Sequence, residues 1–184
     1  MIGAIIGDIV GSRFEWDNHR SKDFDLLTHK CFFTDDSVMS LAVCDALMKC
    51  QGDYSDLGEQ AIRSMQSVGR PYPHCGYGGS FQRWMYSDNP APYNSYGNGA
   101  AMRVSGCGYV GITIDEVQQL SRSVTDVTHN HPEGIKGAEA TAVAVFLART
   151  GKSLIEIQDY IIKNYYPLGF TLDSIRETYR FNET

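Results

Sequence analysis

The residues best suited to chemistry lie in Phe33-Thr34-Asp35-Asp36-Ser37, at the start of a predicted apolar helix. A threonine hydroxyl next to two carboxylates makes a compact group of oxygens that suits a hard cation such as Mg²⁺. Thr34 could instead cap the helix, with both acids complementing the helix dipole. Two carboxylates buried without a partner would be costly, which favours a metal or a cationic ligand. The segment predicts a cation site and leaves the simple cap open.

A second pair of acids, Asp8 and Glu15, belongs to the N-terminal segment. Gly3, Gly7 and Gly11 recur every four residues, so they lie along one stripe of a helix and allow another backbone to approach closely. Asp8 and Glu15 lie on a neighbouring face, where they could place two acids at one pocket. Alternatively, Asp8 accepts hydrogen bonds from backbone donors and Glu15 is solvated at the helix end.

A glycine-containing turn occurs in Tyr96-Gly97-Asn98-Gly99-Ala100-Ala101-Met102-Arg103. It is typical of a turn that opens a helix, whose free N–H groups can hold phosphate. The motifs of nucleotide-binding loops are absent, because neither the GK[ST] ending nor a preceding strand is found. The alternative is a tight turn followed by a structural Arg103.

A histidine-containing segment, Thr128-His129-Asn130-His131-Pro132-Glu133-Gly134, leads into a helix rich in small residues. Two histidines without a third ligand nearby are poor evidence for zinc. Pro132 suits the first position of a helix, so His131 could simply cap that helix.

The elements that must position these residues are predicted to be helices. Several stretches show helical spacing with start signals, and few alternate apolar with polar residues. Capping boxes at 113–116 and 153–156 begin two amphipathic helices. The ranges 38–48 and 138–147 predict buried helices at the centre of the domain. We therefore expect an all-α domain.

A long loop is predicted from Gly69 to Gly97, with one short helix after Ser80. Loops of this length in compact domains are usually functional or disordered. Its many aromatic residues favour an ordered lid or wall, and the alternative is that they cover the core.

The composition indicates one globular domain spanning residues 1–184, with 42% hydrophobic and 21% charged residues. The net charge is −6, and no run of Lys and Arg interleaves with aromatic residues, so we expect no direct nucleic-acid partner. An acidic balance does not forbid an anionic small molecule. No signal peptide or membrane span is evident. Five cysteines without CxxC spacing fit a reducing cytoplasm.

Taken in order, four segments closely resemble the successive motifs of the ADP-ribosylglycohydrolases: 7–11 with Glu15, 33–37, 97–103 and 128–134. The resemblance runs from residue 1 to about residue 182. It implies a compact all-α fold, two Mg²⁺ ions and hydrolysis of the glycosidic bond that links ADP-ribose to a protein side chain or a small compound. ADP-ribose or an ADP-ribosylated protein would then be the partner.

The resemblance also implies a role for individual residues. Asp8 resembles a structural or outer-shell acid, and Glu15 matches a mobile acid near the metals. Arg103 belongs to the matched motif with a structural role. The implied site consists of Thr34, Asp35 and Asp36 as metal ligands, Glu15 and Asp36 as catalytic residues, and Asn98, Gly99, Ala100 and His131 as ADP-ribose contacts.

One departure from the family concerns the second metal. Members carry a later Gly-Asp-Ser/Thr-Asp-Thr segment, which this sequence lacks, and Leu172-Asp173-Ser174 does not replace it. We therefore expect a domain incomplete at its C-terminal end, without the final helices and the second metal-binding segment. It would be completed by another chain or associate with itself. The alternative function is a non-catalytic ADP-ribose-binding or regulatory remnant.

Overall fold

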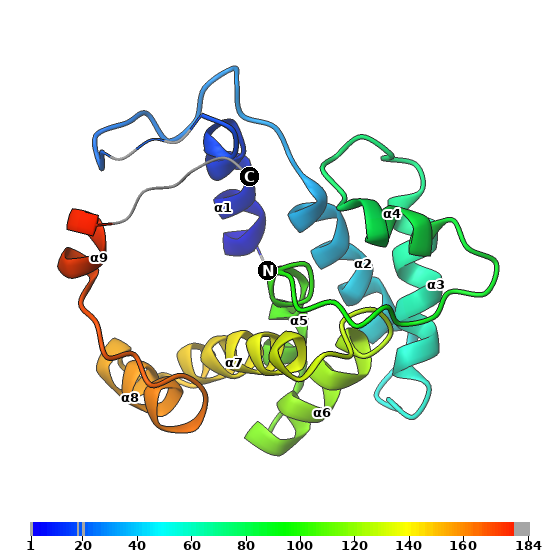
Figure 1. Ribbon diagram of the computed structural model, residues 1–184. Helices are drawn as coiled ribbons and strands as arrows, with labels where there is room; N and C mark the ends of the chain where they lie inside the picture. Colours follow the sequence, from blue (N-terminus) through cyan, green and yellow to red (C-terminus); the bar gives the residue numbers. More distant parts are fainter. Residues whose placement is uncertain (1, 18, 20, 179–184) are drawn as a thin grey trace.

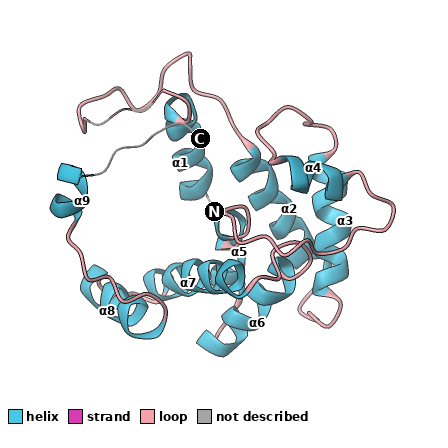
Figure 2. Cartoon of the chain, in the orientation of Figure 1, coloured by secondary structure: helices cyan, strands magenta, loops and turns pink. Residues whose placement is uncertain are grey.

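The computed structural model describes residues 2–17, 19 and 21–178, and in this part of the chain the regular structure is entirely helical (Figures 1 and 2). The predicted all-α class is confirmed. The α-helices are α1 (Ile2–Gly11), α2 (Asp35–Lys49), α3 (Leu57–Gly69), α4 (Gly79–Met85), α5 (Ser105–Val110), α6 (Ile114–Thr125), α7 (Pro132–Arg149), α8 (Leu154–Asn164) and α9 (Leu172–Thr178), with 3₁₀ turns η1 (Ser12–Phe14) and η2 (Ala101–Arg103).

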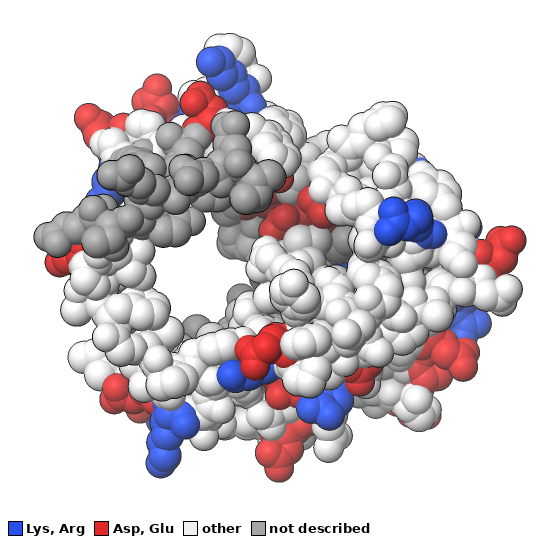
Figure 3. All heavy atoms as spheres, viewed as in Figure 1, with Lys and Arg blue, Asp and Glu red and all other residues white. Residues whose placement is uncertain are grey.

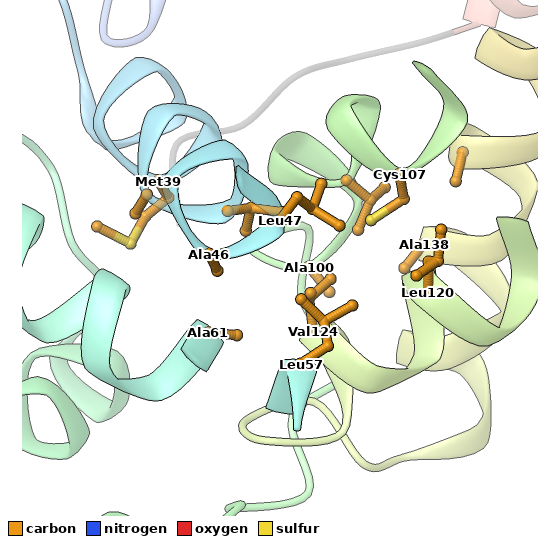
Figure 4. Packing of buried hydrophobic residues seen from close by; sticks show 14 of the residues in the cluster. Met39, Ala46, Leu47, Leu57, Ala61, Ala100, Cys107, Leu120, Val124 and Ala138 are labelled. Carbon is orange, nitrogen blue, oxygen red and sulfur yellow. The ribbon is translucent and has the colours of Figure 1, made fainter. Parts of the chain in front are cut away.

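The core lies where α2, packed on α3, meets the group formed by α5, α6 and α7. Side chains from all five helices meet there, as Figure 4 shows for Met39 and Leu47 of α2, Leu57 of α3 and Val124 of α6. The backbones of α5 and α7 also come close, because a Cβ added to Gly108 of α5 would collide with a backbone carbonyl oxygen of α7. Burial of each large apolar side chain contributes roughly 1.5–3 kcal/mol, so this junction holds the domain together.

Helices α2 and α7 occupy the centre predicted for them, but α2 is not covered on every side. Met39 and Val43 are fully buried, whereas Leu41 and Met48 are 50% and 77% exposed. One apolar face of α2 therefore remains open to solvent.

The predicted helix starts at 113–116 and 153–156 are both present. The Thr113 side chain accepts a hydrogen bond from the Glu116 backbone N–H. The Glu116 carboxylate in turn accepts one from the backbone N–H of Ile112, the residue before Thr113. At α8 the box is reciprocal, because Ser153 and Glu156 each satisfy the other's backbone N–H. These caps fix where α6 and α8 begin.

Helix α1 has no buried residue. Its glycine stripe has open space around it, since nothing lies within 4 Å of a Cβ built on Gly3, Gly7 or Gly11. The close backbone contact expected at this stripe is therefore not made within the described residues. An apolar cavity of about 730 Å³ lies between α1, α2 and α5, lined by Ile2 and Leu47 among others.

The segment 69–97 combines both expected roles of its aromatic residues. Phe81 and Trp84 of the short helix α4 are buried in the core, whereas Tyr72 and Tyr96 are exposed. Tyr93 is half-buried and lines a cavity described below. This segment therefore covers the core with one part and forms a wall with the other.

Among the described helices, none combines the length and the apolar character needed to cross a membrane. All five cysteines lie among the described residues, and none of them is in a disulfide bond. Three expectations stay predictions: the cytoplasmic location, the single domain that is incomplete at its C-terminal end, and the association with a second chain.

Candidate active site

The start of α2 is tied to α1 by the carboxylate of Asp8. Its two oxygens accept hydrogen bonds from the backbone N–H of Thr34 at 2.8 Å and from the Thr34 hydroxyl at 2.5 Å. One of them also accepts from the Ser37 backbone at 3.2 Å and the Ser37 hydroxyl at 2.5 Å. Hydrogen bonds to a charged acceptor are the strong ones, so Asp8 fixes the turn that carries the two adjacent acids. The backbone-binding alternative for Asp8 is confirmed.

Thr34 is the N-cap of α2, because its hydroxyl oxygen accepts from the Asp36 backbone N–H at 3.3 Å. Asp35 and Asp36 follow in the first turn, where the helix dipole favours negative charge. The cap is thus present, and the geometry leaves both carboxylates half-buried beside α1. Capping and a cation site are compatible here, since the cap uses only the threonine.

A cavity of about 400 Å³ brings the distant segments together. Glu15, Asp35 and Asp36 line one part of it, and the 97–99 turn lines another. A neighbouring hollow is lined by Asp8, Glu15, Thr34 and Asp36. Acidic atoms are visible in the hollow between α1 and the start of α2 (Figure 3). The predicted meeting of Glu15 with Asp35 and Asp36 in one cavity is confirmed, whereas Thr34 lines the neighbouring hollow together with Glu15 and Asp36.

These acids disfavour one another's ionised state. Burial, followed by the negative charge of Asp36, raises the pKa of Asp35 to about 6. Burial is also the main reason that the pKa of Glu15 and that of Asp36 are raised, and Asp8 adds to both shifts. Among the described residues no Lys, Arg or His forms an ion pair with these carboxylates. A cation or a proton would relieve the repulsion.

The donor types at this cavity fit magnesium, but only in part. Carboxylates and a hydroxyl are the oxygens that Mg²⁺ prefers. Within the described ranges, however, no three His, Cys, Asp or Glu side chains are grouped so as to hold a metal ion. Thr34, Asp35 and Asp36 therefore fit part of a magnesium site, and their role as ligands stays a prediction.

The glycine-containing turn lies as expected at the cavity but does not open an α-helix. Gly97, Asn98 and Gly99 line the cavity, and the chain then forms η2 before α5 begins. Ala100 is fully buried and is not part of the cavity wall, so its expected contact with a ligand is not supported by its position. Burial in the core, at the junction shown in Figure 4, accounts for that correction.

The histidine at the cavity is His129, and the prediction that His131 borders it is wrong. His131 caps α7, since its Nδ1 accepts from the Glu133 backbone N–H at 3.1 Å, and its ring packs on exposed Tyr96. His131 is not among the residues that line the cavity, and its contact with ADP-ribose stays a prediction. His129 is 4% exposed and lines the cavity, and its pKa is lowered to about 4 by burial and by the charge of Arg103. It is therefore neutral near pH 7.

A sequence profile of the ADP-ribosylglycohydrolase family matches residues 1–182. The chain belongs to this family. ADP-ribosylhydrolase ARH3 of Homo sapiens is 29% identical over 188 residues, which cover 85% of this chain and 50% of that protein. The Mus musculus protein of the same name is 29% identical over 186 residues with the same coverage, and that of Xenopus tropicalis is 27% identical over 178 residues. The chain spans about half the length of these relatives.

Further residues of this ADP-ribosylglycohydrolase cavity come from the loop before α4, which sequence reasoning treated only as a lid or wall. Gly76 has φ +114°, and a Cβ there would lie 2.9 Å from Oδ1 of Asp35, so only glycine fits beside that acid. The sequence signal that could have indicated this part of the cavity was the density of glycines between the aromatic residues of the loop. The lining residues not predicted individually are Gly76, Gly78, Gly79, Ser80, Phe81, Tyr93, Ser95, Met102, Arg103 and His129.

Proposed function

We propose that this family member hydrolyses the glycosidic bond between ADP-ribose and a modified protein side chain or a small ADP-ribosyl compound, with Mg²⁺ as cofactor. The observation that carries the proposal is one cavity lined by Glu15, Asp35 and Asp36 together with the 97–99 turn. Its volume of about 400 Å³ falls in the usual range of small-molecule sites. The relatives named as ADP-ribosylhydrolases support the same reaction class.

Glycosidic hydrolysis needs proton transfer to or from oxygen while positive charge develops on the sugar. Glu15 is suited to that transfer, because it lines the cavity on an exposed 3₁₀ end and its raised pKa lets it keep a proton at higher pH than an ordinary glutamate. Asp36 faces the same cavity and its negative charge opposes loss of that proton. We assign acid–base catalysis to Glu15, with Asp36 beside it.

Mg²⁺ when bound would supply positive charge against the ribose hydroxyls and an oriented water. Thr34, Asp35 and Asp36 would hold it, and Asp8 would fix their backbone. The 97–99 turn lines the same cavity as Asp35 and Asp36, and there Asn98 and Gly99 would contact ADP-ribose.

A binding module without turnover is the second candidate. It is favoured by the finding that no three ligating side chains group within the described residues, since two-metal chemistry needs ligands that fix both ions. Such a module would keep the turn at 97–99 and the neutral His129.

Turnover and binding measured side by side test the proposal. The chain is incubated with Mg²⁺ and ADP-ribosyl-arginine or ADP-ribosyl-serine, while calorimetry measures ADP-ribose binding. We expect turnover to be poor for the 184-residue chain alone and to rise when a polypeptide matching the remaining half of its relatives is added. Asp36→Asn should abolish that rise, and Asp115→Asn, an exposed acid in the first turn of α6, should not. Binding without turnover under all conditions favours the module, and absence of both contradicts the proposal.

A further inference from the structure

A buried polar chain lies behind the cavity and connects α6 with the turn before α7. Arg103 is fully buried, and its Nη2 donates to the Val124 carbonyl at 3.0 Å and to the Thr128 hydroxyl oxygen at 2.7 Å. The same hydroxyl oxygen lies 2.8 Å from Nδ1 of His129. Arg103 and His129 both line the cavity, whereas Thr128 is enclosed between them with no exposed surface.

The direction of the Thr128–His129 hydrogen bond follows from counting donors and acceptors. The Thr125 carbonyl already accepts from the backbone N–H of Thr128 at 3.0 Å and of His129 at 2.8 Å, which uses its two lone pairs. A third contact, from the Thr128 hydroxyl, is longer at 3.3 Å. Arg103 occupies one lone pair of that hydroxyl, and its positive charge makes the hydroxyl a better proton donor. On this count we assign the hydroxyl proton to Nδ1 of His129.

The opposite nitrogen of the ring lies under the 97–99 turn. A Cβ built on Gly99 would be 3.2 Å from Nε2 of His129, so the ring edge and the turn are in close contact at the cavity. If Nδ1 accepts a proton from Thr128, a neutral imidazole carries its own proton on Nε2. That proton is then available to an oxygen acceptor beside the turn.

We propose that Arg103 and Thr128 are positioning residues that fix His129 as its Nε2–H tautomer, so that it donates a hydrogen bond to a ribose or phosphate oxygen of the ligand. The inference rests on the proposed function for the identity of the ligand. The tautomer itself depends only on the contacts described above. The neutrality of His129 agrees with its burial next to a guanidinium.

Nitrogen-15 NMR of the histidine side chains, recorded at pH 7.5 without ligand, tests the tautomer directly. We expect Nδ1 of His129 to resonate in the unprotonated range and Nε2 in the protonated range, with the signal assigned by its loss in His129→Asn. Thr128→Val removes the hydroxyl and should shift both signals toward a mixture of tautomers, whereas Thr128→Ser should restore the original pattern. His131, whose Nδ1 accepts from a backbone N–H, is the internal control and should not change.

Calorimetry with ADP-ribose supplies the functional readout. Loss of one well-directed hydrogen bond should weaken binding about tenfold in Thr128→Val, and Thr128→Ser should bind within about twofold of the parent chain. A protonated Nδ1 in the parent chain would overturn the proposed positioning of His129 by Arg103 and Thr128, even if ADP-ribose binds. An unchanged tautomer in Thr128→Val would overturn it as well. If the tautomer is as expected and the parent chain binds no ADP-ribose, the proposed function fails and the ligand-facing part of the inference fails with it.

Discussion

Replacing Asp35 by Asn should stabilise the protein, although the substitution removes an acid from the first turn of a helix. Asp35 is half-buried, and Asp36, Glu15 and Asp8 all add negative charge around it. No cation among the described residues compensates that charge. Asparagine keeps the shape of the side chain and removes the charge that opposes folding.

The magnitude follows from the rise in the pKa of Asp35 from its ordinary value of 3.8 to about 6. A rise of that size in a fully enclosed group corresponds to about 3 kcal/mol. Solvent reaches part of this carboxyl, so about 1–2 kcal/mol is the expected gain. Because the folded state holds the proton more tightly than the unfolded chain, the penalty is absent below about pH 4. This destabilisation by the ionised Asp35 grows between about pH 4 and pH 6 and is complete above about pH 6.

Urea denaturation without added metal, at pH 4 and at pH 7.5, measures this effect. Asp35→Asn should raise the free energy of unfolding at pH 7.5 and leave it nearly unchanged at pH 4. Asp115→Asn is the matched control, because it removes an acid from the first turn of α6 on an exposed surface. The control should lose a few tenths of a kcal/mol through the helix dipole.

Adding Mg²⁺ provides a second test of the same variant, through its effect on the free energy of unfolding. A cation that binds the acids would stabilise the parent chain and should stabilise Asp35→Asn less, so the gain should shrink as Mg²⁺ is added. Destabilisation by Asp35→Asn at pH 7.5 without metal would refute the reasoning, since it would show that the helix dipole and local hydrogen bonds outweigh the repulsion among the acids.

Two further predictions concern the fold. Asp8→Ala should lower the free energy of unfolding by about 2 kcal/mol, because Thr34 and Ser37 lose their shared acceptor; an unchanged urea midpoint would contradict the anchoring role of Asp8. Gly108→Ala should cost about 1–3 kcal/mol by forcing α5 away from α7. Gly7→Ala should instead add about 0.5–1 kcal/mol through helix propensity in open space, and equal thermal shifts for the two alanine variants would rule out the packing argument.

Local signals in the sequence were sufficient for the fold class and for most helix starts. The caps at Thr113 and Ser153 depend on residues three positions apart, so they can be read without knowing the fold. Helix α3 was not predicted, although Leu57, Ala61 and Met65 recur every four residues and are all buried. The signal was present, since Asp56 stands at the N-cap and Glu59 follows three residues later, but this helix-start pattern was not used in the sequence prediction.

The sequence by itself also determined which residue types would meet at the site, since the acids Asp35 and Asp36 and the 97–99 turn were both recognisable before their positions were known. Only the tertiary structure decided which neighbours complete the cavity. His129 and His131 are two residues apart, and the difference between them is that one ring contacts Thr128 inside the fold while the other caps α7. Arg103 likewise acquires its partners from α6 and the following turn, 21 and 25 residues away. Contacts over such separations depend on how the helices pack, which no local pattern specifies.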